Sequence, residues 1–358
     1  MFYSSTILYL RRHCFNMPNN QNTVIKKEGR IIYISIARFV AMLMIITCHM
    51  LQYYKSELAF WFNVGVQVFF VISGFLYGRK DINSPIAFIY RRFKTILIPY
   101  WSFLLLAISC YLLLCPQELS MSSVVRAFTC SGTINGLGHL WFVGYILFCY
   151  LLTPYLYSLR QYTEKWSLRK TLLFYCFLLA VLKIIGFLFD SYFKPEIISC
   201  FILGFFWADL CKRLYSHQIG IFKWLVILIA LLMNGVEIYI KYFTSLEFVG
   251  WQYTVFSSFC GYSHMFLGLI IFLLFYGKFG KAKYSWILRF SDKYSYPIYL
   301  AHLLFILSPL TLMSITDIKM INWLLVFIAI LIAGVFVYHL SKWVESLISS
   351  TLGRVISA

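Results

Sequence analysis

Arg38 and His49 are two ionisable residues inside an apolar stretch that extends over residues 31–52. In a helix, positions eleven apart lie on nearly the same face, about 16 Å apart along the axis. A charge inside a membrane span is costly, is usually functional, and must face protein or trapped water. A guanidinium binds anions, and a neutral imidazole is the usual general base near neutral pH. The pair therefore predicts an anion-binding group and a proton acceptor on one helix face. The alternative is structural: an arginine bonded to carbonyls and a histidine that caps the helix.

A short basic run, YRRFK, comes just before the third apolar stretch and contains Arg91, Arg92 and Lys94. Three cations this close together could bind the phosphates of an anionic substrate. They could equally be the basic residues that fix the orientation of a membrane segment. The sequence leaves both interpretations open.

Four further polar residues fall within or beside apolar stretches: Ser73, His139, Tyr299 and His302. His139 opens the fourth stretch, and Tyr299 and His302 are three positions apart, on one helix face. His139, Tyr299 and His302 are candidates to orient His49 or to polarise a carbonyl group, and Ser73 is a further candidate for the same polar site. Each could also have a purely structural role. The ten cysteines show no CxxC or Cys/His spacing, so we predict no metal site. Cys115 and Cys130 could pair if their compartment is oxidising.

The elements that must position these residues are membrane helices. The chain of 358 residues is 61% hydrophobic and only 12% charged, which is not typical of a soluble domain. Its formal net charge of +18 comes from short basic clusters between apolar stretches. That distribution is typical of membrane topology signals. We therefore predict a lipid bilayer as partner, and no nucleic acid.

Ten apolar segments are predicted as transmembrane helices. They are residues 31–52, 60–77, 95–115, 139–157, 171–189, 197–211, 221–240, 254–276, 295–314 and 321–340. Of the 31 Lys and Arg residues, 24 lie in the tails and the even-numbered connections, and five lie in the odd-numbered ones. The positive-inside rule then places both termini in the cytoplasm.

The predicted fold is an all-α, polytopic bundle with one membrane domain, residues 31–345. It is flanked by cytoplasmic tails over residues 1–30 and 346–358. Residues 1–16 do not have the pattern of a signal peptide, and Met17 is an alternative start.

Taken together, these stretches resemble one family, the integral-membrane acyltransferases called acyltransferase family 3. The matching features are Arg38 and His49, FFVISGF at 69–75, HLWFVGY at 139–145, SYPIYLAH at 295–302, and Glu345 near the C-terminus. They span nearly the whole chain in the family's order. Two features depart from the family pattern: Thr95 stands where a second arginine is common, and Gln67 stands where members often carry an acid.

The resemblance implies transfer of an acetyl or other short acyl group from cytoplasmic acyl-CoA to a hydroxyl of a surface carbohydrate or its lipid-linked precursor. The enzyme would be an O-acyltransferase of the cytoplasmic (inner) membrane. Acetyl-CoA would be its donor substrate, with no bound cofactor. Arg91, Arg92, Lys94 and Arg38 would hold the CoA, and His49 would act as base or carry the acyl group itself. The acceptor glycan stays open, as does the oligomeric state, with a homo-oligomer among the alternatives.

The main competing interpretation is a transporter or exporter of a surface polysaccharide, without acyl transfer. A transporter would more often show internal repeats and helices broken at mid-membrane. Neither is visible in the sequence, whereas the Arg38–His49 pair favours the enzyme.

Overall fold

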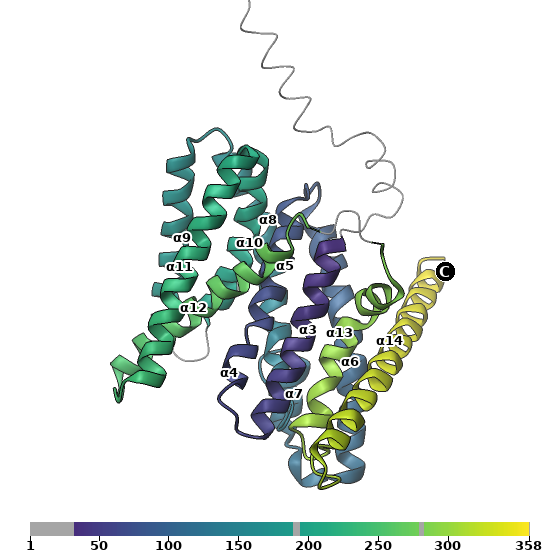
Figure 1. The fold of residues 1–358 in the computed structure, drawn as a ribbon. Helices are drawn as coiled ribbons and strands as arrows, with labels where there is room; N and C mark the ends of the chain where they lie inside the picture. The colour runs from purple at the N-terminus through teal and green to yellow at the C-terminus, as the bar shows by residue number, and fades with distance from the viewer. Residues whose placement is uncertain (1–31, 189–193, 279–282, 358) are drawn as a thin grey trace, which may run out of the picture.

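The computed structural model describes residues 32–188, 194–278 and 283–357, and within these ranges the regular secondary structure is helical (Figure 1). The long helices are α3 (Ile32–Tyr53), α5 (Gly65–Gly78), α6 (Pro85–Leu114), α8 (Trp141–Thr163), α9 (Leu168–Leu188), α10 (Pro195–Arg213), α11 (Ser216–Phe243), α12 (Trp251–Phe275), α13 (Trp286–Ile306) and α14 (Lys319–Ser357). Short helices are α4 (Ala59–Phe62), α7 (Met121–Phe128), η1 (Pro116–Glu118) and η2 (Gly138–Leu140). The proposed tail over residues 1–30, with Met17, lies outside the described residues.

Eight helical segments of the described chain are long and apolar enough to cross a membrane, when α4 and α5 are taken as one segment. α10 and α13, which match two more of the predicted segments, carry too many charged residues to satisfy the same criterion. Only 17% of the apolar window of α9 and 11% of that of α11 is buried in the protein, so most of their apolar side chains face outward, as expected for contact with lipid. The chain is therefore a multi-pass membrane protein, as predicted.

The helices alternate in direction, and α3 begins and α14 ends at the same end of the bundle (Figure 1). We call this the terminal end and the opposite one the distal end. α14 continues without a break through Ser357, so most of the tail predicted over residues 346–358 is helical.

Two predicted helix boundaries were wrong in a way that matters for the site. The helix predicted over residues 295–314 is α13, which begins at Trp286 and ends at Ile306. The helix predicted over residues 95–115 is α6, which begins at Pro85 after Ser84 caps its first turn. Charged residues within the first three turns lower the hydropathy of both N-terminal segments, although a serine caps each helix and proline at N1 also favours the start of α6. The basic run YRRFK is therefore part of a helix rather than a loop.

Helices α5 and α10 pack closely against each other, because glycines let their backbones touch. A Cβ on Gly74 would overlap the carbonyl of Phe201, and a Cβ on Gly204 would overlap the carbonyl of Val71. Small residues at the contact are the usual device for close packing of membrane helices. The FFVISGF motif thus makes a packing contact between α5 and α10. Helix α5 also packs against α3, the helix that carries His49.

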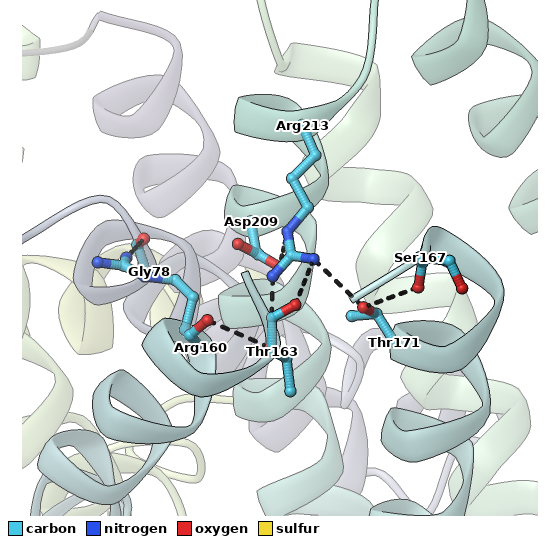
Figure 2. A network of polar contacts seen from close by, with 7 residues as sticks. All are labelled: Gly78, Arg160, Thr163, Ser167, Thr171, Asp209 and Arg213. Atoms are coloured by element: carbon cyan, nitrogen blue, oxygen red, sulfur yellow. Dashed lines mark hydrogen bonds and ion pairs between the residues drawn. The ribbon is translucent and has the colours of Figure 1, made fainter. Parts of the chain in front are cut away.

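Figure 2 shows a polar network that joins α8, α9 and α10 at the terminal end. Arg213 donates from Nη1 to the Thr163 carbonyl (3.0 Å) and to Thr171 Oγ1 (3.2 Å), and it pairs with Asp209 (2.9 Å). Arg160 donates to the Gly78 carbonyl and pairs with Asp81 (2.9 Å). These bonds satisfy a carbonyl at the end of α8 and one at the end of α5, and they fix the position of α8 against α5 and α10.

Candidate active site

Helix α3 carries both candidate catalytic residues on one uninterrupted run of 22 residues. Arg38 lies toward the terminal end and His49 toward the distal end, separated by about 16 Å of helical rise. Ala37, Ala41 and Ile45 are buried in the core and hold the helix in place. Both functional side chains are half-buried, and each meets a group from α13.

At the distal end, three histidines and a tyrosine from three parts of the chain come together. The ring centroid of His302 lies 5.1 Å from that of His49 and 4.6 Å from that of His139. The Tyr299 ring lies 5.4 Å from the His139 ring and 5.3 Å from the His302 ring. The sequence prediction grouped these four residues, and the structure places them side by side.

Hydrogen bonds set which nitrogen of each imidazole carries a proton. His49 Nδ1 lies 2.6 Å from Gln52 Oε1, and His139 Nε2 lies 2.9 Å from the Leu300 carbonyl. His302 Nδ1 contacts the Tyr299 carbonyl. Because amide and carbonyl oxygens only accept, each of these nitrogens is the donor. The lone pairs are therefore on His49 Nε2, His139 Nδ1 and His302 Nε2.

Among the described residues, no group is hydrogen-bonded to the remaining nitrogens of the two buried histidines. His139 Nδ1 and His302 Nε2 are buried without a hydrogen bond, on side chains that are 4% and 0% exposed. Two imidazolium charges about 5 Å apart would repel by about 3 kcal/mol at an effective dielectric constant of about 20. The cluster therefore favours one proton at a time. His49, the most exposed of the three, is the ring best placed to exchange a proton with a substrate.

A cavity of about 240 Å³, which we call the histidine cavity, opens beside this cluster. Its walls include His49, Gln52, His139 and Tyr299. This volume is several times the roughly 30 Å³ that one molecule occupies in liquid water, so a small acyl group and a hydroxyl have room there. His49 thus borders a space in which a reaction could occur.

The loop before α8 holds His139 in place. Gly136 adopts a positive φ of 73°, and a Cβ there would lie 2.6 Å from Ser308 Cα, so glycine is required. Tyr111 donates to the Asn135 carbonyl (2.8 Å), and Tyr299 Oη donates to the His139 carbonyl (2.8 Å). His139 is therefore bonded on both its ring and its backbone.

Toward the terminal end, Arg38 meets Asp292 of α13, with Nη1 and Oδ1 3.9 Å apart. The other carboxylate oxygen of Asp292 accepts bonds of 2.6 Å from Ser35 and from Tyr284. Asp292 is only 8% exposed, so these bonds compensate much of the cost of burying its charge. The sequence analysis missed Asp292. The signal was available, because Arg38 needed a buried carboxylate and the chain has only 13 acidic residues.

Arg92, on α6, is half-buried and its side chain contacts α5. Its Nη1 donates to Tyr77 Oη (2.8 Å), and its guanidinium lies over the rings of Tyr77 and Phe88. Its Nε is buried, and no residue in the described part of the chain accepts a hydrogen bond from it. Desolvation, together with the positive charges of Arg92 and Arg91, lowers the pKa of Lys80 in the adjoining loop. The cations are thus close enough to repel one another, and an anion would relieve that repulsion.

Arg91 and Lys94 take different positions on the same helix. Arg91 is exposed, and its Nε bonds only to the Ala87 carbonyl of its own helix (3.1 Å). Lys94 pairs with Glu345 of α14 (3.3 Å), which also binds Lys342 (2.7 Å). Glu345 therefore ties the basic segment to the last helix, and Arg91 is the most exposed of the three cations.

Ser73 is not part of the histidine cluster. It is half-buried on α5, does not line the histidine cavity, and makes no hydrogen bond seen among the described residues. No cluster of three metal-ligating side chains occurs in the part of the chain that the structure describes. Cys115 and Cys130 are both free thiols in the structure.

The comparison with protein families decides the class. The family model of the acyltransferase 3 family, described as an acyltransferase domain, matches residues 31–340. The chain belongs to this family. The match begins at the start of the first span and continues well into α14, so it includes both the Arg38–Asp292 pair and the histidine cluster. No curated protein and no solved structure matches the chain. The family implies that this membrane protein is a transferase that moves an acyl group.

Proposed function

We propose that this acyltransferase moves an acetyl or other short acyl group from cytoplasmic acyl-CoA to a hydroxyl of a cell-surface carbohydrate or its lipid-linked precursor. The observation that carries the proposal is the histidine cluster. It places an unprotonated His49 Nε2 beside a small cavity, on the same helix as Arg38 but nearer the opposite end. This arrangement suits a reaction whose donor enters at one end and whose acceptor enters at the other.

The orientation follows from charge. The terminal end carries most of the Lys and Arg residues, which favours placing it in the cytoplasm. The distal end, with the histidine cavity, would then face outward. In a bacterium this would be the cytoplasmic membrane, with acyl-CoA on the basic side and surface glycans on the other.

We assign donor docking to Arg91, Arg92 and Arg38. CoA carries several phosphate charges, and the exposed Arg91 and the unpartnered Nε of Arg92 supply donors for them. Lys94 contributes less, because Glu345 already neutralises much of its charge. The pantetheine arm would follow α3 past Arg38 toward His49, a distance of about 16 Å.

In the proposed reaction, His49 Nε2 takes the proton of the acceptor hydroxyl as the oxygen attacks the thioester carbon. A carbon–oxygen bond forms and the carbon–sulfur bond breaks. His49 then gives its proton to the departing CoA thiolate. Gln52 holds Nδ1–H during these steps, so that the imidazolium keeps a hydrogen bond. The buried rings of His139 and His302 position His49 and disfavour a second charge nearby. In a variant of this route, His49 first receives the acyl group itself.

The direct test is to incubate membranes carrying the protein with acyl-labelled acetyl-CoA and to follow the label. Transfer to a base-labile ester on surface glycan, lost in His49→Ala membranes, is the expected result. Glycan export without any labelled ester would contradict the enzyme and favour the transporter interpretation. A label that appears on His49 before it appears on glycan would select the acyl-histidine route.

A further inference from the structure

A second, larger cavity opens next to the histidine cavity at the distal end. Its volume is about 770 Å³, and it lies between α7, the start of α8 and the start of α10. Gly138 and Trp141 line both cavities, so the two adjoin at the point where α8 begins. We call the larger one the lateral cavity. Its volume is within the range of sites that hold ligands of several rings.

The charges of the lateral cavity all have one sign. Arg126 of α7 and Lys194 at the start of α10 line it, and no carboxylate does so among the residues that the structure describes. Arg126 makes no ion pair there, and Lys194 Nζ lies 5.0 Å from the centre of the Trp141 ring. Glu196 is close enough to interact with Lys194, but it is not part of the lining. A concave site with two cations attracts anions.

The rest of the lining suits a carbohydrate. Trp141 and Tyr145 present rings on successive turns of α8, with centroids 5.3 Å apart. Tyr145 Oη accepts the backbone N–H of Lys194 (2.7 Å), which joins the aromatic wall to the basic one. Ser131 and Thr133 add hydroxyl groups on the loop side. Flat apolar rings beside hydroxyl and charged donors can contact both the faces and the polar edges of sugar rings.

We propose that the lateral cavity is the acceptor subsite and that it takes a glycan bearing an anionic group, a carboxylate or a phosphate. This inference rests on the proposed function, because it places the acceptor hydroxyl in the histidine cavity beyond Trp141. Arg126 and Lys194 bind the anionic group, and Trp141 and Tyr145 support the sugar ring between that group and His49. The two cations then determine which glycans are acylated.

The test uses the full-length protein in lipid nanodiscs and three oligosaccharide probes. They are tetragalacturonate, its carboxyl-reduced neutral counterpart, and a glycerol-phosphate oligomer, which separates carboxylate from phosphate recognition. Binding of each is measured by calorimetry at two salt concentrations for the wild type, Arg126→Gln and Lys194→Gln. Lys319→Gln is the matched control, since it removes a charge at the same end outside the cavity. Consumption of acyl-CoA is measured separately in the same samples.

We expect the wild type to bind at least one anionic probe about tenfold or more tightly than the neutral one, with weaker binding in higher salt. Arg126→Gln and Lys194→Gln should each lose most of that preference, and Lys319→Gln should keep it. Equal binding of anionic and neutral probes, or equal preference in all variants, would overturn the inference. Selective binding without consumption of acyl-CoA would leave the subsite standing and contradict the proposed function instead. Consumption of acyl-CoA without selective binding of an anionic probe would contradict the subsite and leave the proposed function standing.

Discussion

Replacement of His49 by alanine should reduce acyl transfer far more than it reduces acyl-CoA binding. His49 is the most exposed of the three clustered histidines, its Nε2 is free to accept a proton, and it lies about 16 Å along α3 from Arg38. Loss of a general base typically costs 10²–10⁴-fold in rate. No contact of His49 with the basic residues at the terminal end exists among the described residues, so its removal should leave donor affinity within about threefold.

Gln52→Leu gives a graded companion to this variant. Gln52 does not react, but its 2.6 Å bond to Nδ1 fixes the tautomer that leaves Nε2 free. A hydrogen bond of this kind contributes about 0.5–1.5 kcal/mol net, which corresponds to a rate loss of about two- to tenfold. The expected order of rates is therefore wild type, then Gln52→Leu, then His49→Ala, with the last at least tenfold below the second.

The assay is single-turnover transfer from labelled acetyl-CoA in nanodiscs, with donor affinity measured separately by calorimetry. Equal melting temperatures for the three proteins would show that the rates compare folded enzymes. A His49→Ala rate within tenfold of wild type would refute the role of His49 as base. If Gln52→Leu were as slow as His49→Ala, Gln52 would have to do more than hold the imidazole.

Three further outcomes follow from the same geometry. Arg38→Ala should weaken acyl-CoA binding by about tenfold or more in calorimetry, because charge-assisted bonds contribute about 1.5–3 kcal/mol; unchanged affinity would make Arg38 structural. Gly74→Ala should lower the melting temperature markedly, since its methyl would overlap a backbone carbonyl of α10, whereas Gly235→Ala, whose methyl meets nothing, should not. Equal effects would contradict the packing argument. In a cysteine-free background, an impermeant thiol reagent should label Ser56→Cys on intact cells and Lys165→Cys only after permeabilisation; the reverse pattern would invert the orientation.

The membrane helices could be predicted because lipid imposes a simple requirement on sequence. An apolar run of about 20 residues is needed to span the hydrocarbon, and α3, α9 and α11 show it plainly. The criterion fails where a span carries charges that protein, not lipid, surrounds. α13 contains Arg289, Asp292 and Lys293 in its first turns, so its predicted start at residue 295 came nine residues too late.

The histidine cluster could be predicted for a different reason. His49 and His139 each fall at the distal end of a predicted span, so alternating topology brings these two to one side of the membrane. His302 lies only seven residues into the span predicted over 295–314, and it is the observed end of α13 at Ile306 that places it near the distal end. What topology could not give is the depth of each ring, the hydrogen bonds that set each tautomer, or the absence of Ser73 from the group. Those depend on rotation and tilt, which side-chain packing determines.

Helices α3 and α13 run in the same direction, and two polar pairs join them. Arg38 meets Asp292 toward the terminal end, and His49 meets His302 toward the distal end. The spacing is eleven residues on α3 and ten on α13, so both contacts form in a single register of the two helices. An axial slip of one helical turn, about 5.4 Å, would break both at once and leave a buried carboxylate unpaired. Asp292 therefore does more than neutralise Arg38, because the same register brings His302 to His49.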